Sequence, residues 1–531
     1  MKSTPTLSQR LGLCLLSGGL VCFSFPNFLD KSLTPFTAFL GWFALIPFFL
    51  ALRNANAKQG AWLGFVFGFT QLGLILYWIA FLEEAKYLSG LAWFVLVFYL
   101  SLYFLLFGAW YCFLVNRLKI SGLFIAPFLW LALEYIRGSR PWGGFNWGEI
   151  GYSQAPYPSV LVFTTIGGVY GLTFAMVWFN ASLAKAMELF LTQPDPIPST
   201  IPNRSRWFLL MLPLVFLAGL FAVGNHVIKT AALKKSGTAV LIQPSIDQSV
   251  KWTKSNEDAT YDKIGKLVQS QSSAKTDLII WPETAAPSFL LMTPKSLARV
   301  TSIVRKSSTA QLVGCLDEQR GKDNVTRYYN GAVHFDRAGK PAGVYHKRHL
   351  VPFGEFVPFQ KYLTFLGPVV GDLGNFDFGA EYQKFQAGGF SYTPMICYEV
   401  IFPGDVQKAF KTGADALVNI SNDAWYGRTA SAYQHVMMAV VRAAEEQKPL
   451  LRAANTGISL ATDPFGRILT STKLFEETAV KADVMTLSTG QTLYSRWGNW
   501  LPRLCWLVVL LLCLTAVLKK PASTGEGIAN L

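Results

Sequence analysis

Three residues with complementary chemistry follow strand-like apolar segments in the second half of the chain. Glu283 lies in Ile-Trp-Pro-Glu-Thr, Lys347 lies in His-Lys-Arg-His-Leu, and Cys397 lies in Ile-Cys-Tyr-Glu. A carboxylate can act as a base, a thiol as a nucleophile, and an ammonium group can stabilise a developing oxyanion. These three residue types together are sufficient for acyl transfer through a thioester on Cys397.

Each of these residues is weak evidence when it is considered alone. A cysteine in an apolar strand is usually an inert core residue, because a free thiol packs as a small hydrophobe. A glutamate after a strand and a lysine in a basic cluster are usually solvated surface charges. The prediction of a catalytic site therefore rests on the three residues occurring together, each near the end of a strand.

The elements that would position these residues occupy residues 237–490, where short apolar runs alternate with polar, helix-like stretches. The predicted strands are 239–243, 277–281, 310–315, 392–397 and 416–420, and the predicted helices are 256–272, 294–306 and 430–447. Alternation of strands and helices favours an α/β sandwich. The spacing of Cys and His shows no zinc-site or disulfide pattern, and we expect neither a metal nor a cofactor.

The composition excludes a single soluble domain. Hydrophobic residues make up 51% of the 531 residues, and charged residues make up only 15%. The net charge is +15, but Lys and Arg mostly flank apolar runs and form no dense patch. This distribution favours a membrane protein over a nucleic-acid-binding protein.

Eight apolar runs reach or approach the length of about 20 residues that a helix needs to cross a bilayer. They are 11–27, 35–52, 60–82, 90–115, 122–137, 159–183, 207–228 and 499–518. If the N-terminus lies inside, the cytoplasmic segments carry eleven Lys and Arg residues and the opposite short segments carry four, in agreement with the positive-inside rule. We therefore expect a seven-helix transmembrane domain over 1–229, a large outer domain over 237–490, an eighth helix over 499–518 and a flexible cytoplasmic tail over 521–531.

Two irregular segments have open interpretations. The Gly- and Trp-rich loop at 137–148 is either an ordinary interfacial turn or a platform that receives lipid headgroups. The Gly- and Phe-rich segment 353–378 is either a lid that contacts lipid or a surface loop that packs on its domain.

The Glu–Lys–Cys pattern resembles the nitrilase superfamily, whose triad sits on an αββα sandwich, and this resemblance covers about residues 237–490. With seven helices before that domain and one after it, the whole chain resembles the membrane-embedded apolipoprotein N-acyltransferase family of bacterial inner membranes. The resemblance implies that Glu283, Lys347 and Cys397 are catalytic. It also implies functional roles for a further set of residues, namely Trp252, Glu355, Tyr398, Glu399 and Trp425.

The resemblance further implies an activity and a location. A phospholipid would donate an acyl chain to the N-terminal α-amino group of a diacylglyceryl-cysteine in an apolipoprotein, without a cofactor or nucleic acid. The catalytic domain would lie on the periplasmic side of the inner membrane. Two alternatives stay open: a membrane-tethered amidohydrolase with the same triad, which would use water as the acceptor, and a transporter with a soluble accessory domain.

Overall fold

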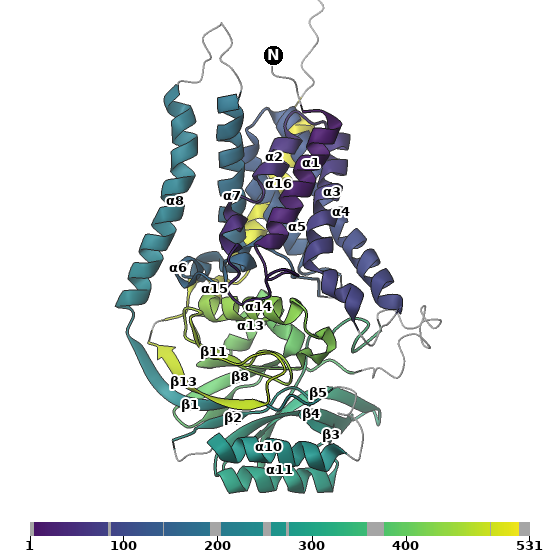
Figure 1. The fold of residues 1–531 in the computed structure, drawn as a ribbon, viewed down its shortest axis with the longest axis vertical. Helices are drawn as coiled ribbons and strands as arrows, with labels where there is room; N and C mark the ends of the chain where they lie inside the picture. Colours follow the sequence, from purple (N-terminus) through teal and green to yellow (C-terminus); the bar gives the residue numbers. More distant parts are fainter. Residues whose placement is uncertain are drawn as a thin grey trace, which may run out of the picture.

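The computed structural model describes residues 5–82, 87–141, 143–191, 203–247, 256–271, 275–357, 376–488 and 490–519. Figure 1 shows two parts stacked along the long axis of the molecule, a bundle of helices and a domain of two β-sheets. Three sequence predictions fall outside the described residues. They concern Trp252, most of the segment 353–378 and the tail 521–531.

The helical part contains a helix within or across each of the eight predicted apolar runs. These helices are α1 (Leu7–Phe23), α2 (Ile46–Leu52), α3 (Ala57–Ile75), α4 (Tyr87–Leu118), α5 (Gly122–Arg137), α7 (Thr164–Leu191), α8 (Asn203–Thr230) and α16 (Trp500–Leu518). Among the described residues, four helices are long and apolar enough to cross a membrane, and these are α4, α7, α8 and α16. The C-terminal helix α16 packs back against α4, α5 and α7, so the two ends of the chain build one bundle.

Two of the predicted runs are broken into shorter helices. The run 35–52 forms the 3₁₀ helix η1 (Ala38–Trp42) before α2 begins. The run 159–183 forms the short helix α6 (Pro158–Leu161) and then α7, which is interrupted at Gly167 and at Gly168, where φ is 66°. A residue without Cβ adopts this left-handed conformation at low cost. The interruption leaves the Val169 N–H free to donate to Glu445 of the other part, at 2.6 Å.

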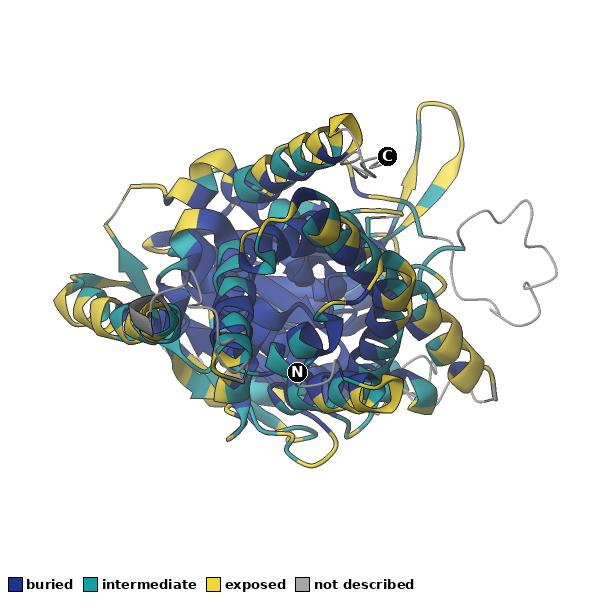
Figure 2. Ribbon diagram, turned by 90° about the horizontal axis from the view of Figure 1, so that it is seen from above, coloured by how far each residue is buried: buried dark blue, intermediate teal, exposed yellow. Residues whose placement is uncertain are grey.

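Outward-facing apolar side chains cover the helical part. In Figure 2 the exposed positions lie on the outer surfaces of the bundle, and the buried positions fill its centre. Large exposed apolar residues on α4, α8 and α16 include Phe94, Phe98, Trp207, Phe208, Leu507 and Leu514. Such surfaces are unfavourable in water and are the expected lipid-facing surfaces of a membrane bundle.

The second part is built from two sheets. The first has the order β13–β1–β2–β4–β5–β6, and β3 also pairs with β4. The second has the order β12–β11–β10–β9–β8–β7. Their strands are β1 (Leu233–Gln243), β2 (Leu278–Ile280), β3 (Ala286–Phe289), β4 (Ala310–Arg320), β5 (Thr326–Phe335), β6 (Pro341–His346), β7 (Phe385–Ala387), β8 (Phe390–Ile396), β9 (Ala416–Ser421), β10 (Leu450–Ala454), β11 (Leu460–Thr462), β12 (Ile468–Ser471) and β13 (Thr478–Leu487).

The sheets face each other across an apolar core that includes Leu241, Leu312, Ile396 and Val418. Helices α10 (Glu257–Gln271) and α11 (Pro294–Ser307) cover the outer face of the first sheet. Helices α13 (Pro403–Phe410) and α14 (Ser431–Glu446) cover the second sheet and lie between it and the bundle. This arrangement confirms the predicted αββα sandwich joined to a multi-helix part. A continuous buried cluster extends from the bundle into α13 and α14.

Candidate active site

The structure brings Glu283 and Lys347 together at one end of the sandwich. Glu283 follows β2 and Lys347 follows β6, and Lys347 Nζ lies 3.5 Å from Glu283 Oε1. Lys347 Nζ also lies 2.8 Å from Glu355 Oε1. The Lys347 side chain is only 1% exposed, so this ionic group is almost completely removed from water.

Cys397 lies next to this group, at the point where β8 ends and the 3₁₀ helix η6 (Cys397–Ile401) begins. Burial raises the pKa of the Cys397 thiol to about 12; the charge of Glu283 adds to this increase, and the charge of Lys347 opposes it. The thiol is therefore protonated near neutral pH. Because the thiolate is the reactive form, a base must remove the proton as the sulfur attacks.

The backbone of Cys397 has an unusual conformation. Its φ is 51°, in the left-handed region that side chains with a Cβ rarely adopt. Its carbonyl oxygen accepts hydrogen bonds from Asn419 Nδ2 at 3.4 Å and from His435 Nε2 at 3.3 Å. A residue persists in this conformation when its surroundings hold it, and such residues cluster at functional sites.

Two donors orient the carboxylate of Glu283. Its Oε1 accepts from Asn330 Nδ2 at 2.7 Å, and its Oε2 accepts from the backbone N–H of Asn422 at 2.8 Å. Asn330 also donates to Glu355 Oε1 at 2.9 Å. Asn330 could not be predicted as part of the site, because it lies within β5 and belongs to no recognisable motif.

Glu355 holds Lys347 in place. Its Oε1 accepts from Lys347 and Asn330, and its Oε2 accepts from the backbone N–H of Val351 at 2.9 Å. Burial acts to lower the pKa of Lys347, but the carboxylates of Glu355 and Glu283 outweigh burial and raise it. Lys347 is therefore a permanent cation whose position is set by Glu355.

The remaining predicted residues surround this group in different ways. Glu399 is fully buried, and its carboxylate accepts from the backbone N–H groups of Ile396, Arg348 and His349 at 2.6, 2.7 and 3.1 Å. Tyr398 packs against the rings of His349 and Phe402. Trp425 is half-buried in the short helix η7 (Asp423–Tyr426).

Glu399 thus joins the segment after Lys347 to the strand that ends at Cys397. Tyr345 also donates its hydroxyl to both Glu399 oxygens at 2.9 Å. Burial raises the pKa of Glu399 to about 7, while the hydrogen bonds from Ile396 and Arg348 oppose this increase. These contacts fix the segment after Lys347 and the turn at Cys397 relative to each other.

We expect Glu399→Gln to destabilise the protein by about 1–3 kcal/mol, because the amide nitrogen would face backbone N–H groups that then lose their acceptor. The measurement is the thermal unfolding midpoint of the purified full-length protein. Glu381→Gln in the segment before β7 is the control, since that residue is solvent-exposed. An unchanged midpoint for Glu399→Gln would show that these hydrogen bonds contribute no net stability.

The described residues contain no group of three or more His, Cys, Asp and Glu side chains that could hold a metal ion. The side chains that this site brings together are the ionic group and the Cys397 thiol. A buried carboxylate, a buried ammonium group and a neighbouring protonated thiol are suited to covalent acyl transfer.

Both parts of the chain are similar to known protein families. The carbon-nitrogen hydrolase family model matches residues 238–493, and the model of the apolipoprotein N-acyltransferase N-terminal domain matches residues 17–182. The crystal structure of an amidase from a Nesterenkonia species is 17% identical, covers 48% of this chain and 92% of its own, and has a TM-score of 0.36.

Two curated relatives match nearly the whole chain. The apolipoprotein N-acyltransferase of Geobacter metallireducens is 34% identical over 496 residues, which are 92% of this chain and 91% of the relative. The apolipoprotein N-acyltransferase of Vibrio cholerae is 34% identical over 477 residues, which are 86% of this chain and 88% of the relative. Since the similarity extends through the helical part and the sandwich alike, the chain belongs to the apolipoprotein N-acyltransferase family.

Proposed function

We propose that this protein transfers an acyl chain from a phospholipid to the N-terminal α-amino group of diacylglyceryl-cysteine in apolipoproteins, through a thioester on Cys397. The observation that carries the proposal is the buried ion pair of Glu283 and Lys347 beside the protonated Cys397 thiol. The family supports the acceptor, because its members are named for acylating apolipoproteins.

In the first half-reaction, Glu283 accepts the Cys397 proton as the sulfur attacks the ester carbonyl of the phospholipid. A carbon–sulfur bond forms, and the negative charge on the carbonyl oxygen is stabilised by Lys347. The carbon–oxygen ester bond then breaks, and Glu283 returns the proton to the departing alkoxide. The products are a thioester on Cys397 and a lysophospholipid.

In the second half-reaction, the α-amino group of the apolipoprotein attacks the thioester. A carbon–nitrogen bond forms, Glu283 accepts a proton from the amine, and the carbon–sulfur bond breaks. The proton passes to the Cys397 sulfur, so the enzyme returns to its starting state and the acceptor leaves as an amide. This sequence is a ping-pong reaction. Burial of the ionic group limits access of water, which would otherwise hydrolyse the thioester.

Mass spectrometry tests this function directly. Purified full-length protein is incubated with a phospholipid that carries one defined acyl chain, and the peptide containing Cys397 is expected to gain the mass of that acyl group. Addition of a diacylglyceryl-modified peptide with a free N-terminus should discharge the thioester and yield an N-acylated peptide. Release of free fatty acid without N-acylated product would instead support the amidohydrolase alternative.

The protein is a membrane protein, and we propose that it lies in the bacterial inner membrane with its catalytic sandwich in the periplasm. The support comes from the excess of Lys and Arg in the segments assigned to the cytoplasm. Lipoprotein acceptors exported across that membrane would then meet the site on the side where they emerge.

Reporter fusions test this orientation without an activity assay. An alkaline phosphatase fused after residue 300, within α11, is expected to be active, since this enzyme requires the oxidising periplasm. The same reporter fused after residue 520 should be inactive. The reverse pattern would place the sandwich in the cytoplasm and would contradict the proposed orientation.

A further inference from the structure

Helix α14 lies between the second sheet and the helical part (Figure 1). Almost all its side chains are buried, including two consecutive polar residues, Gln434 and His435. Consecutive residues on a helix point about 100° apart, so these two side chains face different neighbours. One faces the helical part and the other faces the nucleophile.

Gln434 makes four hydrogen bonds, all to the helical part. Its Oε1 accepts from Trp147 Nε1 at 2.6 Å and from Trp78 Nε1 at 3.2 Å. Its Nε2 donates to the carbonyl oxygens of Pro26 at 2.7 Å and Ile75 at 3.2 Å. These contacts use both amide hydrogens and both lone pairs of the oxygen, so α14 is attached to three segments of the bundle, at Pro26, at Ile75 and Trp78, and at Trp147.

The ring of His435 contacts the backbone carbonyl of Cys397. A carbonyl oxygen can only accept, so His435 Nε2 must carry the hydrogen that it donates to Cys397 O at 3.3 Å. Its Nδ1 lies 3.2 Å from Arg452 Nη2, which can only donate, and 3.2 Å from Asp423 Oδ1, which accepts. Burial and the charge of Arg452 lower the pKa of His435, and the charge of Asp423 opposes this decrease. Nε2 carries its hydrogen both in the neutral ring with a bare Nδ1 and in the protonated ring, so the bond to Cys397 O forms in either state.

The partner groups of His435 are themselves held in place. Arg452 Nη2 also donates to Asp423 Oδ2 at 2.8 Å, and Arg452 Nη1 donates to Asn419 Oδ1. Asn419 is the second donor to the Cys397 carbonyl. On its other side, the His435 ring packs 5.8 Å from the ring of Trp147, which also donates to Gln434. One buried network therefore runs from the helical part to the turn that carries Cys397.

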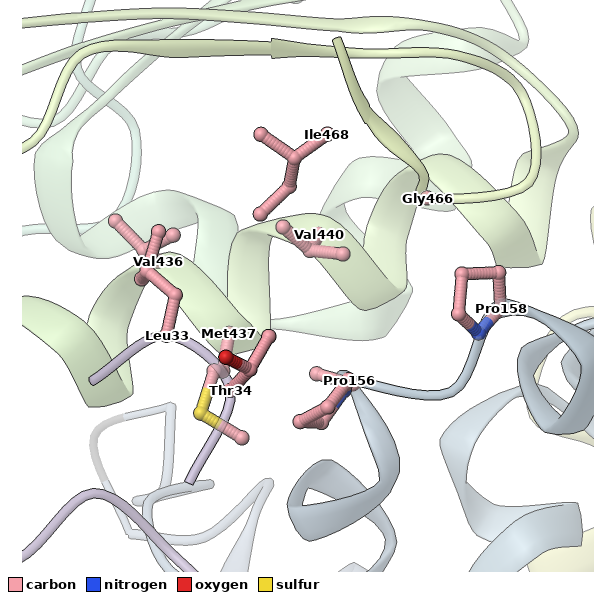
Figure 3. A pocket seen from close by; sticks show the side chains of 10 residues that line it. Leu33, Thr34, Pro156, Pro158, Val436, Met437, Val440, Gly466 and Ile468 are labelled. Atoms are coloured by element: carbon pink, nitrogen blue, oxygen red, sulfur yellow. The ribbon is translucent and has the colours of Figure 1, made fainter. Parts of the chain in front are cut away.

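A third face of α14 is apolar and takes no part in the hydrogen bonds to Cys397 or to the tryptophans. Val436, Met437 and Val440 line an apolar cavity of about 140 Å³ together with Leu33, Pro156 and Ile468 (Figure 3). Substitutions on this face change the packing of α14 without removing a hydrogen bond of the network, so they provide a matched control.

We propose that His435 is a positioning residue for the nucleophile and that Gln434 extends this positioning to the helical part. The turn at Cys397 has an unfavourable left-handed φ of 51°, and its carbonyl oxygen accepts from Asn419 and His435. Helix α14 thereby makes the reactivity of Cys397 dependent on the docking of the sandwich to the bundle. This inference rests on the proposed thioester chemistry.

Three substitutions at His435 separate positioning from stability. Glutamine places its amide nitrogen near the position of Nε2, so His435→Gln should keep the donor to Cys397 O. His435→Asn places the amide nitrogen near Nδ1, and His435→Leu has no donor at all. Both variants should therefore form the thioester about tenfold more slowly, which is the factor that one lost hydrogen bond is typically worth. The rate is measured at saturating phospholipid per folded enzyme, and KM for phospholipid should stay unchanged.

The expected order is wild type, then glutamine, then asparagine and leucine. Equal rates for His435→Gln and His435→Asn, or rates that follow only the unfolding midpoints, would overturn the positioning role. If the leucine variant fails to fold, the comparison of the glutamine and asparagine variants still tests the positioning role of His435. A wild-type protein that forms no thioester at all would instead contradict the proposed function.

The role of Gln434 is tested by a double-mutant cycle. Gln434→Met keeps the size of the side chain but removes its four hydrogen bonds, and we expect thioester formation to slow about tenfold. If Gln434 acts through His435, the double variant Gln434→Met, His435→Asn should be no slower than the slower single variant. If the double variant were slowed by the product of the two single-variant factors, Gln434 would act independently of His435, which would contradict the proposed coupling. Met437→Leu, on the cavity face, should keep the wild-type rate.

Discussion

Replacement of Cys397 by alanine is expected to abolish thioester formation and to lower acyl transfer by a factor on the order of 10⁴ or more, as for loss of other catalytic nucleophiles. Alanine has no atom that can form the covalent intermediate. Its Cβ occupies the same place as that of cysteine, so the turn at φ 51° needs no new backbone conformation. The measurement is the acyl mass on the peptide that contains residue 397, together with the yield of N-acylated acceptor.

Cys315→Ala is the matched control for this prediction. Cys315 is also a fully buried cysteine of the sandwich, but it lies on β4 within the apolar core between the first sheet and helices α10 and α11. Burial raises the pKa of this thiol as well, and the charge of Asp317 adds to this increase. This variant should retain transfer. Accumulation of N-acylated lipoprotein by Cys397→Ala would end the assignment of the nucleophile.

Glu283→Gln should slow thioester formation by about 10²- to 10⁴-fold, the usual contribution of a general base. The amide has the same shape but cannot accept the thiol proton. Because burial raises the pKa of Cys397 to about 12, almost no thiolate is present near neutral pH without that base. The residual rate of the variant should therefore increase as pH is raised, since direct deprotonation becomes the route to the thiolate.

The measurement is the rate of acyl-adduct formation at several pH values, in a single turnover with excess phospholipid. Glu446→Gln provides the comparison, since Glu446 is a buried glutamate at the end of α14 that accepts from Ser495 rather than from a group of the ionic cluster. It should form the adduct at the wild-type rate. Wild-type kinetics for Glu283→Gln would assign the base role to another group.

Elements with strong local patterns could be predicted from the sequence. The run 392–397 is observed as β8 at Phe390–Ile396, and the helical spacing of 430–447 is observed as α14 at Ser431–Glu446. Both are formed by residues whose periodicity or continuous burial is a local property. The turn at 336–340 that joins β5 to β6 is also a local property, because Asp and Gly there favour a turn.

Other elements could not be predicted because their local signal is weak. Strand β4 continues to Arg320 through Asp317, Glu318 and Gln319, a polar stretch without apolar alternation. It is a strand because β5 pairs with it along its whole length, which is a tertiary contact. The interruption of α7 at Gly168 likewise depends on a tertiary contact, the hydrogen bond from the Val169 N–H to Glu445.

The sequence by itself determined the residue types of the site, the alternation of strands and helices, and the presence of lipid-compatible helices. The tertiary structure alone decided which polar groups meet. Asn330 contacts Glu283 from another strand, Glu399 faces the segment after Lys347, and His435 reaches the carbonyl of Cys397. These partners are far apart along the chain and carry no spacing signal, because the distance between them is set by the packing of two sheets and a helix rather than by local geometry.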